Sequence, residues 1–212
     1  MHIRTSSLAF TATALLLAAV ATTAHSDIEP ERFEASDEQK KKLGAGEILV
    51  DVEKEDALHT DVAGVVDAPP LKVWREIASY RAQKEWVPDM MESSKVLKRK
   101  DGYKICRSAT DMPWPIANRT YKLKVENGAR KIGGVQSYVS QFSHYKDSGN
   151  IEEIEGYWIV RPFDGDDDRS FVRQYTKIDL GIAVPKSLIK SGTNKRLPGL
   201  IEALRKQVGS KG

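Results

Sequence analysis

The sequence predicts an α+β domain in which a curved antiparallel β-sheet wraps around one long C-terminal helix. Apolar residues alternate with polar ones, at the period of a β-strand, in successive segments between residues 48 and 180. Near the C-terminus the period changes, and apolar residues recur on one helix face: Leu197, Leu200, Ile201, Leu204 and Val208. A sheet covered by a single long helix is hard to fill completely, so this order of elements predicts an internal hydrophobic cavity.

The first alternating segments predict a β-hairpin followed by a helix. The two strands are expected at residues 48–53 and 58–66, with a polar turn between them. Two prolines after Asp67 end the second strand and suit the first turn of a helix, for which Asp67 is a candidate N-cap. A second, irregular helical stretch is expected at residues 80–88.

The middle of the chain predicts a run of antiparallel strands joined by turns. The segments with strand-like patterns are 95–99, 103–110, 120–126, 135–145, 154–160 and 171–180. Gly128 and the pair Gly133-Gly134 bracket a predicted loop, and residues 164–168 predict an acidic turn. Pro185 is the predicted opening of the C-terminal helical region.

The composition excludes several classes of protein. The chain has 212 residues, with 33 Lys and Arg against 30 Asp and Glu, and this balance argues against nucleic-acid binding. The single cysteine excludes an internal disulfide framework, a Cys-x-x-Cys redox pair and a cysteine-based zinc site. No apolar stretch reaches the roughly 18 residues of a membrane-spanning helix.

The N-terminus predicts a secretory signal peptide over residues 1–24, which is cleaved in the mature protein. A basic start at Arg4 precedes an apolar run of about 14 residues, which is short for a membrane anchor, the alternative interpretation. Small residues then allow cleavage after Ala21, Ala24 or Ser26. We therefore expect a periplasmic or secreted protein.

Two segments are expected after the signal peptide. Residues 25–46 form a predicted polar lead-in, and residues 47–208 form the folded domain. The lead-in contains the run Lys40-Lys41-Lys42, which is either simply solvated or in transient contact with a membrane through anionic lipid headgroups.

Four stretches of the folded domain, in this order, resemble the START-like (SRPBCC, helix-grip) superfamily. The segments at residues 66–74 and 85–90 match its general pattern. Two further stretches resemble START lipid-binding and lipid-transfer domains: Pro-Trp-Pro-Ile-Ala-Asn-Arg-Thr-Tyr at 113–121, and residues 178–206 with their Pro-Lys-Ser-Leu-Ile and Leu-Arg-Lys motifs. Each motif is weak alone, and their order and spacing carry the resemblance over residues 48–208.

The resemblance implies a tunnel for a hydrophobic ligand between the sheet and the C-terminal helix. Its entrance would be gated by that helix and by the loop at residues 126–134. Thr120 replaces the family's usual Asp after Arg119, and an ungapped comparison puts Cys106 and Val125 where sterol-carrying members bury an acid and an arginine. The ligand stays open between a sterol, an acyl lipid and an isoprenoid, with the last two favoured.

Arg119 is the candidate that would orient the head of a ligand. It follows a proline-rich turn and opens a strand, so it either faces the cavity, with Asp111 as its partner, or forms a structural ion pair. The other candidate ligand-binding residues share the predicted cavity or its mouth: Trp114, Tyr121, Leu123, Val125, Cys106, Trp158, Leu188, Leu200 and Leu204. Plain core packing is the alternative for the tryptophans and for Cys106.

These features predict a protein that binds one hydrophobic ligand, most simply a lipid, in its cavity and carries or shields it. We expect a monomer that uses no cofactor and no metal and whose partner is a hydrophobic small molecule. Two alternatives stay open. One is an enzyme of the same fold, cyclase- or hydrolase-like, that acts on a hydrophobic substrate, and the other is a protein-interaction module.

The sequence offers little that supports catalysis or metal binding. His59 and His144 fall on separate predicted strands, without a nearby Ser or Cys nucleophile pattern. The acidic residues at 164–168 resemble the start of a calcium-binding loop. Arg169 stands where that loop needs glycine, however, and Tyr175 where it needs glutamate, so calcium binding is rejected.

The pair Pro198-Gly199 lies within the predicted C-terminal helical region. One hypothesis is that it kinks the helix and eases opening of a lid over the cavity. The alternative is that the helix simply begins at Pro198, after an irregular segment.

Overall fold

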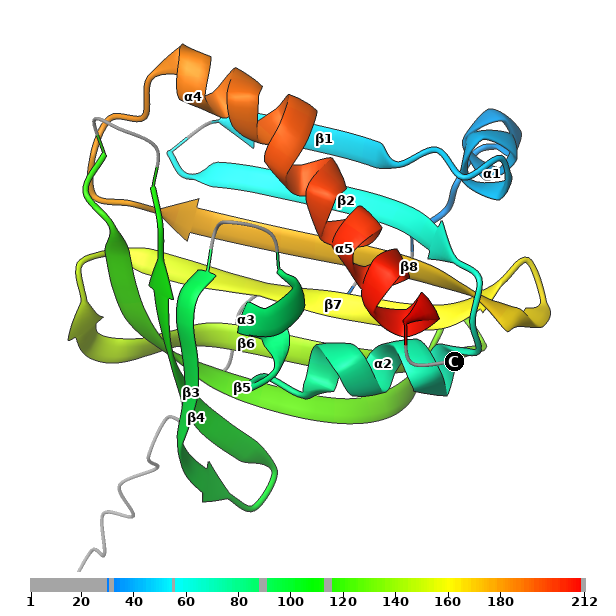
Figure 1. Ribbon diagram of the computed structural model, residues 1–212, viewed down its shortest axis with the longest axis horizontal. Helices are drawn as coiled ribbons and strands as arrows, with labels where there is room; N and C mark the ends of the chain where they lie inside the picture. The colour runs from blue at the N-terminus through cyan, green and yellow to red at the C-terminus, as the bar shows by residue number, and fades with distance from the viewer. Residues whose placement is uncertain (1–29, 31–32, 55, 88–90, 113–115, 211–212) are drawn as a thin grey trace, which may run out of the picture.

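The computed structural model describes residues 30, 33–54, 56–87, 91–112 and 116–210. Within these residues, eight strands form one antiparallel sheet in the order β1-β2-β8-β7-β6-β5-β4-β3 (Figure 1). Their bounds are β1 Leu49–Lys54, β2 Leu58–Val66, β3 Met91–Lys100, β4 Tyr103–Thr110, β5 Arg119–Ile132, β6 Val135–Gly149, β7 Glu153–Phe163 and β8 Asp166–Asp179. The predicted signal peptide at residues 1–24 lies outside the described residues.

Three helices cover one face of this sheet (Figure 1). They are α2 (Pro70–Ala78), which contacts β6, β7 and β8, α3 (Gln83–Trp86), and α5 (Leu197–Gly209), which contacts β2. Two further helices are α1 (Asp37–Gly44) and α4 (Lys186–Ser191). The predicted α+β helix-grip architecture, a sheet packed around a C-terminal helix, is confirmed. Among the described residues, no helix has both the length and the apolar character needed to cross a membrane.

The β5–β6 hairpin is longer than predicted and removes an expected loop. β5 runs through Gly128 to Ile132, and Ile132 pairs directly with Val135. The chain reverses at Gly133-Gly134, where φ angles of 57° and 82° are left-handed conformations that favour glycine. The prediction of a gating loop at residues 126–134 is therefore wrong, because these residues form the end of a hairpin.

The predicted polar lead-in is in part a helix that packs on the sheet. Helix α1 starts with a capping box, in which Ser36 Oγ accepts from the Gln39 backbone N–H at 3.2 Å and Gln39 Oε1 accepts from the Ser36 backbone N–H at 2.9 Å. At the other end of the helix, Leu43 is buried in a cluster with Phe171 and Val65. Segment 25–46 is therefore not wholly solvated.

Asp67 does not cap α2 as predicted. The N-cap position belongs to Pro69, and it provides no side-chain hydrogen bond. Asp67 instead accepts a hydrogen bond at 2.9 Å from Nε of Arg169 on the neighbouring strand β8. The prolines alone are therefore enough to begin this helix, since their missing N–H groups need no partner in the first turn.

The C-terminal helical region changes from a π-helical turn to an α-helix next to Pro198. A π-helical turn, Gly192–Arg196, links α4 to α5. Pro198 lies in the first turn of α5, where a proline is tolerated, so the helix begins there as the alternative interpretation states. The irregularity that was expected at Pro198-Gly199 lies in the π-helical turn before it.

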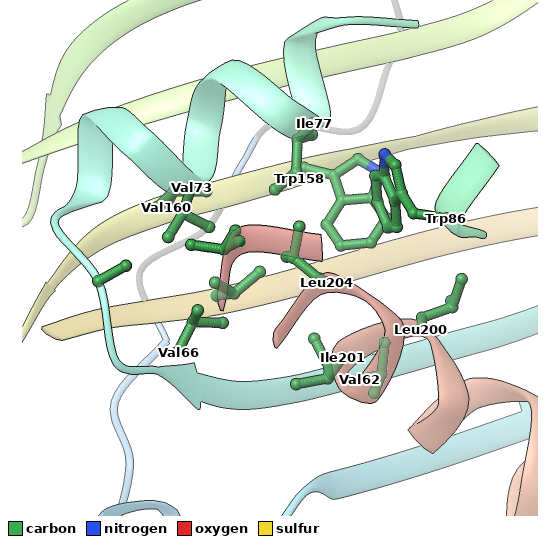
Figure 2. Close-up of a cluster of buried hydrophobic side chains, with 13 residues drawn as sticks. Val62, Val66, Val73, Ile77, Trp86, Trp158, Val160, Leu200, Ile201 and Leu204 are labelled. Atoms are coloured by element: carbon green, nitrogen blue, oxygen red, sulfur yellow. The ribbon is translucent and has the colours of Figure 1, made fainter. Parts of the chain in front are cut away.

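The main core lies between α5, α2 and the covered face of the sheet. Figure 2 shows Ile201 and Leu204 of α5 among Val62, Val66 and Val160 of the strands. Ile201 and Leu204 are fully buried. Each such side chain contributes about 1.5–3 kcal/mol by leaving water, so this seam fixes α5 over the sheet.

Gly64→Ala tests how closely α5 approaches β2. A Cβ atom on Gly64 would lie 2.6 Å from Cγ2 of Ile201, a branch next to the backbone that has little freedom to move. We expect the substitution to lower the free energy of unfolding by about 1–3 kcal/mol, measured by urea denaturation. Gly128→Ala is the matched control, because a Cβ on Gly128 would meet nothing within 4 Å. An equal loss in both variants would contradict this packing.

Candidate functional site

A cavity of about 280 Å³ lies between the covered face of the sheet, α3 and the start of α5. Most of its lining comes from inward-facing positions of the strands, which explains the regular alternation of those segments. The lining residues are Thr60, Tyr80, Gln83, Val87, Met91, Ser108, Thr110, Tyr121, Leu123, Val125, Ser140, Phe142, Ile154, Trp158, Gln174, Thr176, Ile178, Leu197 and Leu200.

Five of the predicted ligand-binding residues line this cavity. They are Tyr121, Leu123, Val125, Trp158 and Leu200. The structure brings them together from β5, β7 and α5, as the alternating pattern and the helix face predict. These residues form a largely apolar wall.

Two other predicted residues are buried but do not line the cavity. Cys106 belongs to a cluster with Leu123 and Val125, and burial raises the pKa of its thiol to about 11. At neutral pH the thiol is therefore protonated and a poor nucleophile. Leu204 lies in the core between α5 and the sheet. Both side chains support the cavity rather than form it.

Arg119 is buried, but it does not line the cavity and does not pair with Asp111. Its Nη1 donates to the carbonyl oxygen of Ala117 at 2.9 Å, and its Nε has no hydrogen-bond partner among the described residues. The Asp111 carboxylate instead accepts from Nδ2 of Asn118 at 2.7 Å. The expected Arg119–Asp111 partnership is therefore wrong.

The remaining two predicted residues fall on parts of the chain that the structure does not describe. Trp114 lies outside the described residues. Leu188 belongs to α4, and its side chain is likewise outside the described part.

The polar part of the lining is neutral, and sequence reasoning identified only Tyr121 of it. Among the described lining residues none carries a charge. Tyr80 hydrogen-bonds to Ser108, and Tyr121 hydrogen-bonds to Thr110 at 3.1 Å. Burial raises the pKa of both tyrosines, so both phenols stay protonated near neutral pH. A signal was available for Ser108 and Thr110, because both share the inward strand face of β4 with Cys106.

The titratable candidates for catalysis do not converge on the cavity. Nδ1 of His59 hydrogen-bonds to the Tyr175 hydroxyl at 2.7 Å, and neither residue lines the cavity. His144 interacts with the carbonyl oxygens of Glu152 and Ser148, each at 3.2 Å. Within the described ranges, no group of three or more His, Cys, Asp or Glu residues could hold a metal ion.

A second hollow, of about 580 Å³, lies between the lead-in segment and the turn that joins β7 to β8. Its lining includes Phe33, Lys40, Phe163 and Asp167. Several charged side chains contribute to its lining, unlike that of the smaller cavity. The smaller cavity is therefore the candidate ligand site.

Solved structures with similar folds include lipid transfer proteins and an aromatase/cyclase. The chain is similar to the STAR-related lipid transfer protein of Xanthomonas axonopodis, with a TM-score of 0.62 and 20% identity, over 76% of this chain and 93% of that one. It is also similar to human StAR-related lipid transfer protein 5, with a TM-score of 0.61 and 12% identity, over 76% and 87% of the two chains. ZhuI aromatase/cyclase from Streptomyces sp. R1128 has a TM-score of 0.56 and 15% identity, over 72% and 94%.

No protein-family model matches the sequence, and neither does any curated protein. The similar structures show that this chain has the START-like fold, which confirms the predicted resemblance. Because they include both lipid transfer proteins and an aromatase/cyclase, the fold is compatible with hydrophobic-ligand binding in either role. The choice between transport and catalysis rests on the site.

Proposed function

We propose that this protein binds one hydrophobic ligand in the cavity between the sheet and α5, and shields or carries it through water. The observation that carries the proposal is the lining, which is apolar or neutral throughout the described residues. Each 100 Å² of apolar ligand surface covered there contributes about 2.5 kcal/mol. The volume of about 280 Å³ suits one compact ligand or a single acyl chain better than a whole two-chain lipid.

Transport is favoured over catalysis by the chemistry of the same lining. General acid–base catalysis needs a group that exchanges protons near the working pH. The tyrosines of the cavity are held protonated by burial, and His59 and His144 do not line it. The predicted signal peptide supports an exported carrier, which would meet its ligand outside the cytoplasm.

The experiment is a titration with the neutral dye Nile red. Ser140 is buried on β6 and lines the cavity, so Ser140→Phe places a ring inside it. Ser143→Phe adds the same ring three residues further along β6, at a position outside the lining, and serves as the matched control. We expect one dye per protein, and an affinity at least tenfold weaker in Ser140→Phe alone, with both variants checked for folding by circular dichroism. Equal affinities in Ser140→Phe and the wild type would overturn the proposal.

A further inference from the structure

The amide of Gln174 is the unusual polar group of the cavity. Gln174 lies on β8 and lines the cavity, with only 9% of its surface exposed. Its Nε2 donates to the hydroxyl oxygen of Thr176, but its Oε1 is buried and accepts no hydrogen bond. Buried acceptors without a partner are rare in folded proteins and weaken the fold, so this one needs an explanation.

Packing alone does not require an amide at this position. Gln174 pairs in register with Val62 of β2 and with Trp158 of β7, both of which belong to the main core cluster. Two residues earlier on the same strand face, Val172 is fully buried in that cluster. An apolar residue would therefore suit position 174, and the amide instead brings an unsatisfied acceptor to the wall of the cavity.

We propose that Gln174 is the polar anchor of the cavity and that it selects a neutral ligand with a hydroxyl group, which donates its hydrogen to Oε1. This inference rests on the proposed function. A hydroxyl fits because it brings a donor without a charge. A carboxylate or phosphate head would place an anion opposite the amide oxygen, with no cation in the described lining to offset its loss of water.

The test compares two ligands that differ only in whether they carry a hydrogen-bond donor. 1-Dodecanol can donate a hydrogen bond, and dodecyl methyl ether of the same chain length cannot. Each is used to displace Nile red from the wild type and from Gln174→Leu, and the ratio of the two displacement constants is compared between proteins. We expect this alcohol-to-ether preference to be about tenfold larger in the wild type than in Gln174→Leu.

The variants make the result interpretable. Leucine removes the unsatisfied amide at similar size, so Gln174→Leu should fold with an unchanged or higher unfolding midpoint. The exposed Gln136→Leu on β6 is the control and should keep the wild-type preference. The same preference in the wild type and Gln174→Leu would overturn this inference while leaving the proposed function intact. Failure of every protein to bind the dye would instead overturn the proposed function.

An independent feature is a basic surface on the side of the sheet that faces away from the cavity. We define the basic face by exposed or half-buried side chains on three neighbouring strands: Lys95, Lys98, Lys100, Arg107, Lys122 and Lys124. Lys95 lies opposite Arg107, and Arg107 opposite Lys122. Like charges directly opposite each other destabilise a sheet. The ion pair found on this face within the described residues joins Lys124 to Glu126 at 3.2 Å.

An apolar side chain lies beside these cations. Leu97 is 50% exposed at a bulge in β3, between Val96 and Lys98. Tyr103, which lies opposite Lys100 at the start of β4, has its ring 5.1 Å from Nζ of Lys124. Proteins that bind anionic membranes typically combine lysines, which contact phosphate headgroups, with an exposed apolar side chain that enters the acyl boundary. Nucleic acid would satisfy the charges but would leave Leu97 without a partner.

We infer that the basic face docks on an anionic lipid bilayer. The experiment is co-sedimentation with vesicles of phosphatidylglycerol and phosphatidylcholine, with pure phosphatidylcholine vesicles for comparison. We expect binding to the anionic vesicles only, weakened by high salt, at least tenfold weaker in Lys95→Glu/Lys122→Glu and clearly weaker in Leu97→Ser. Lys72→Glu on α2, at a half-buried lysine outside the basic face, is the control and should bind as the wild type does.

Two results would overturn the docking inference. One is binding of the double variant equal to that of the wild type. The other is a wild type that ignores the anionic vesicles, whether or not it retains single-stranded RNA in the same assay. Neither result bears on the cavity, because the basic face and the lining share no residue.

Discussion

Leu204→Ala is expected to lower the free energy of unfolding by about 2–5 kcal/mol, because it leaves a cavity in the seam that holds α5. Leu204 is fully buried and belongs to the same cluster as Val160 and Val172 of the sheet (Figure 2). The same helix supplies Leu200 to the ligand cavity. A loosened α5 should therefore also release ligand faster. Urea denaturation measures the first effect, and stopped-flow dissociation of Nile red measures the second.

Glu202→Ala is the matched control for this prediction. Glu202 lies on the exposed side of α5, two residues from Leu204. Its replacement by a good helix former should change the unfolding free energy by no more than about 0.5 kcal/mol. If Leu204→Ala unfolded at the wild-type urea concentration, α5 would not be held by this seam.

Asp61→Ala is expected to cost about 3–5 kcal/mol of unfolding free energy, because it removes the carboxylate that forms a bidentate pair with a largely buried arginine. Asp61 on β2 and Arg173 on β8 form a forked pair, with Nη2–Oδ2 at 2.6 Å and Nε–Oδ1 at 2.9 Å. Their side chains are only 23% and 10% exposed. The guanidinium of Arg173 also lies 5.1 Å from the ring of Phe33 in the lead-in. We therefore expect removal of the Asp61 carboxylate to weaken the packing of the lead-in on the sheet as well. Thermal and urea unfolding of the variant measure this loss.

The chain offers an exposed pair of the same kind as a control. Asp67 accepts from Nε of Arg169, also at 2.9 Å, but its side chain is 84% exposed. Water screens that pair, so Asp67→Ala should cost less than about 1 kcal/mol. Asp61→Ala/Arg173→Met should recover part of the loss, since it removes the buried charge that Asp61 offsets in the wild type. Equal losses in Asp61→Ala and Asp67→Ala would show that burial does not decide the strength of these pairs.

Much of the fold follows from local patterns that the sequence displays. β4 spans 103–110 as predicted, and the inward face of β5 that carries Leu123 was correctly assigned from alternation. Local patterns predict the wrong structure where a contact with a segment distant in the sequence determines it. Gly128 suggests a loop, but pairing with β6 carries the strand through it. Leu43 sits in a charged segment, and only the sheet surface supplied by Phe171 makes it part of a core.

The same distinction between local patterns and distant contacts applies to the residues of the candidate site. Apolar lining residues such as Val125 and Trp158 could be predicted, because alternation and a helix face place them between two elements. Arg119 could not be assigned, since its partner depends on how a turn closes, and the carbonyl oxygen of Ala117 receives its hydrogen bond. Gln174 was missed because a polar residue on an inward strand face looks like an interruption of the pattern rather than part of a lining.

The central claim is that the cavity under α5 holds a hydrophobic ligand in the living cell. Native mass spectrometry of the full protein, purified from its own cell envelope without detergent exchange, tests it most directly. The account predicts one bound molecule per chain, which organic extraction releases and which carries no charged head. A protein that is empty as isolated, and whose cavity also stays closed to Nile red, would contradict it.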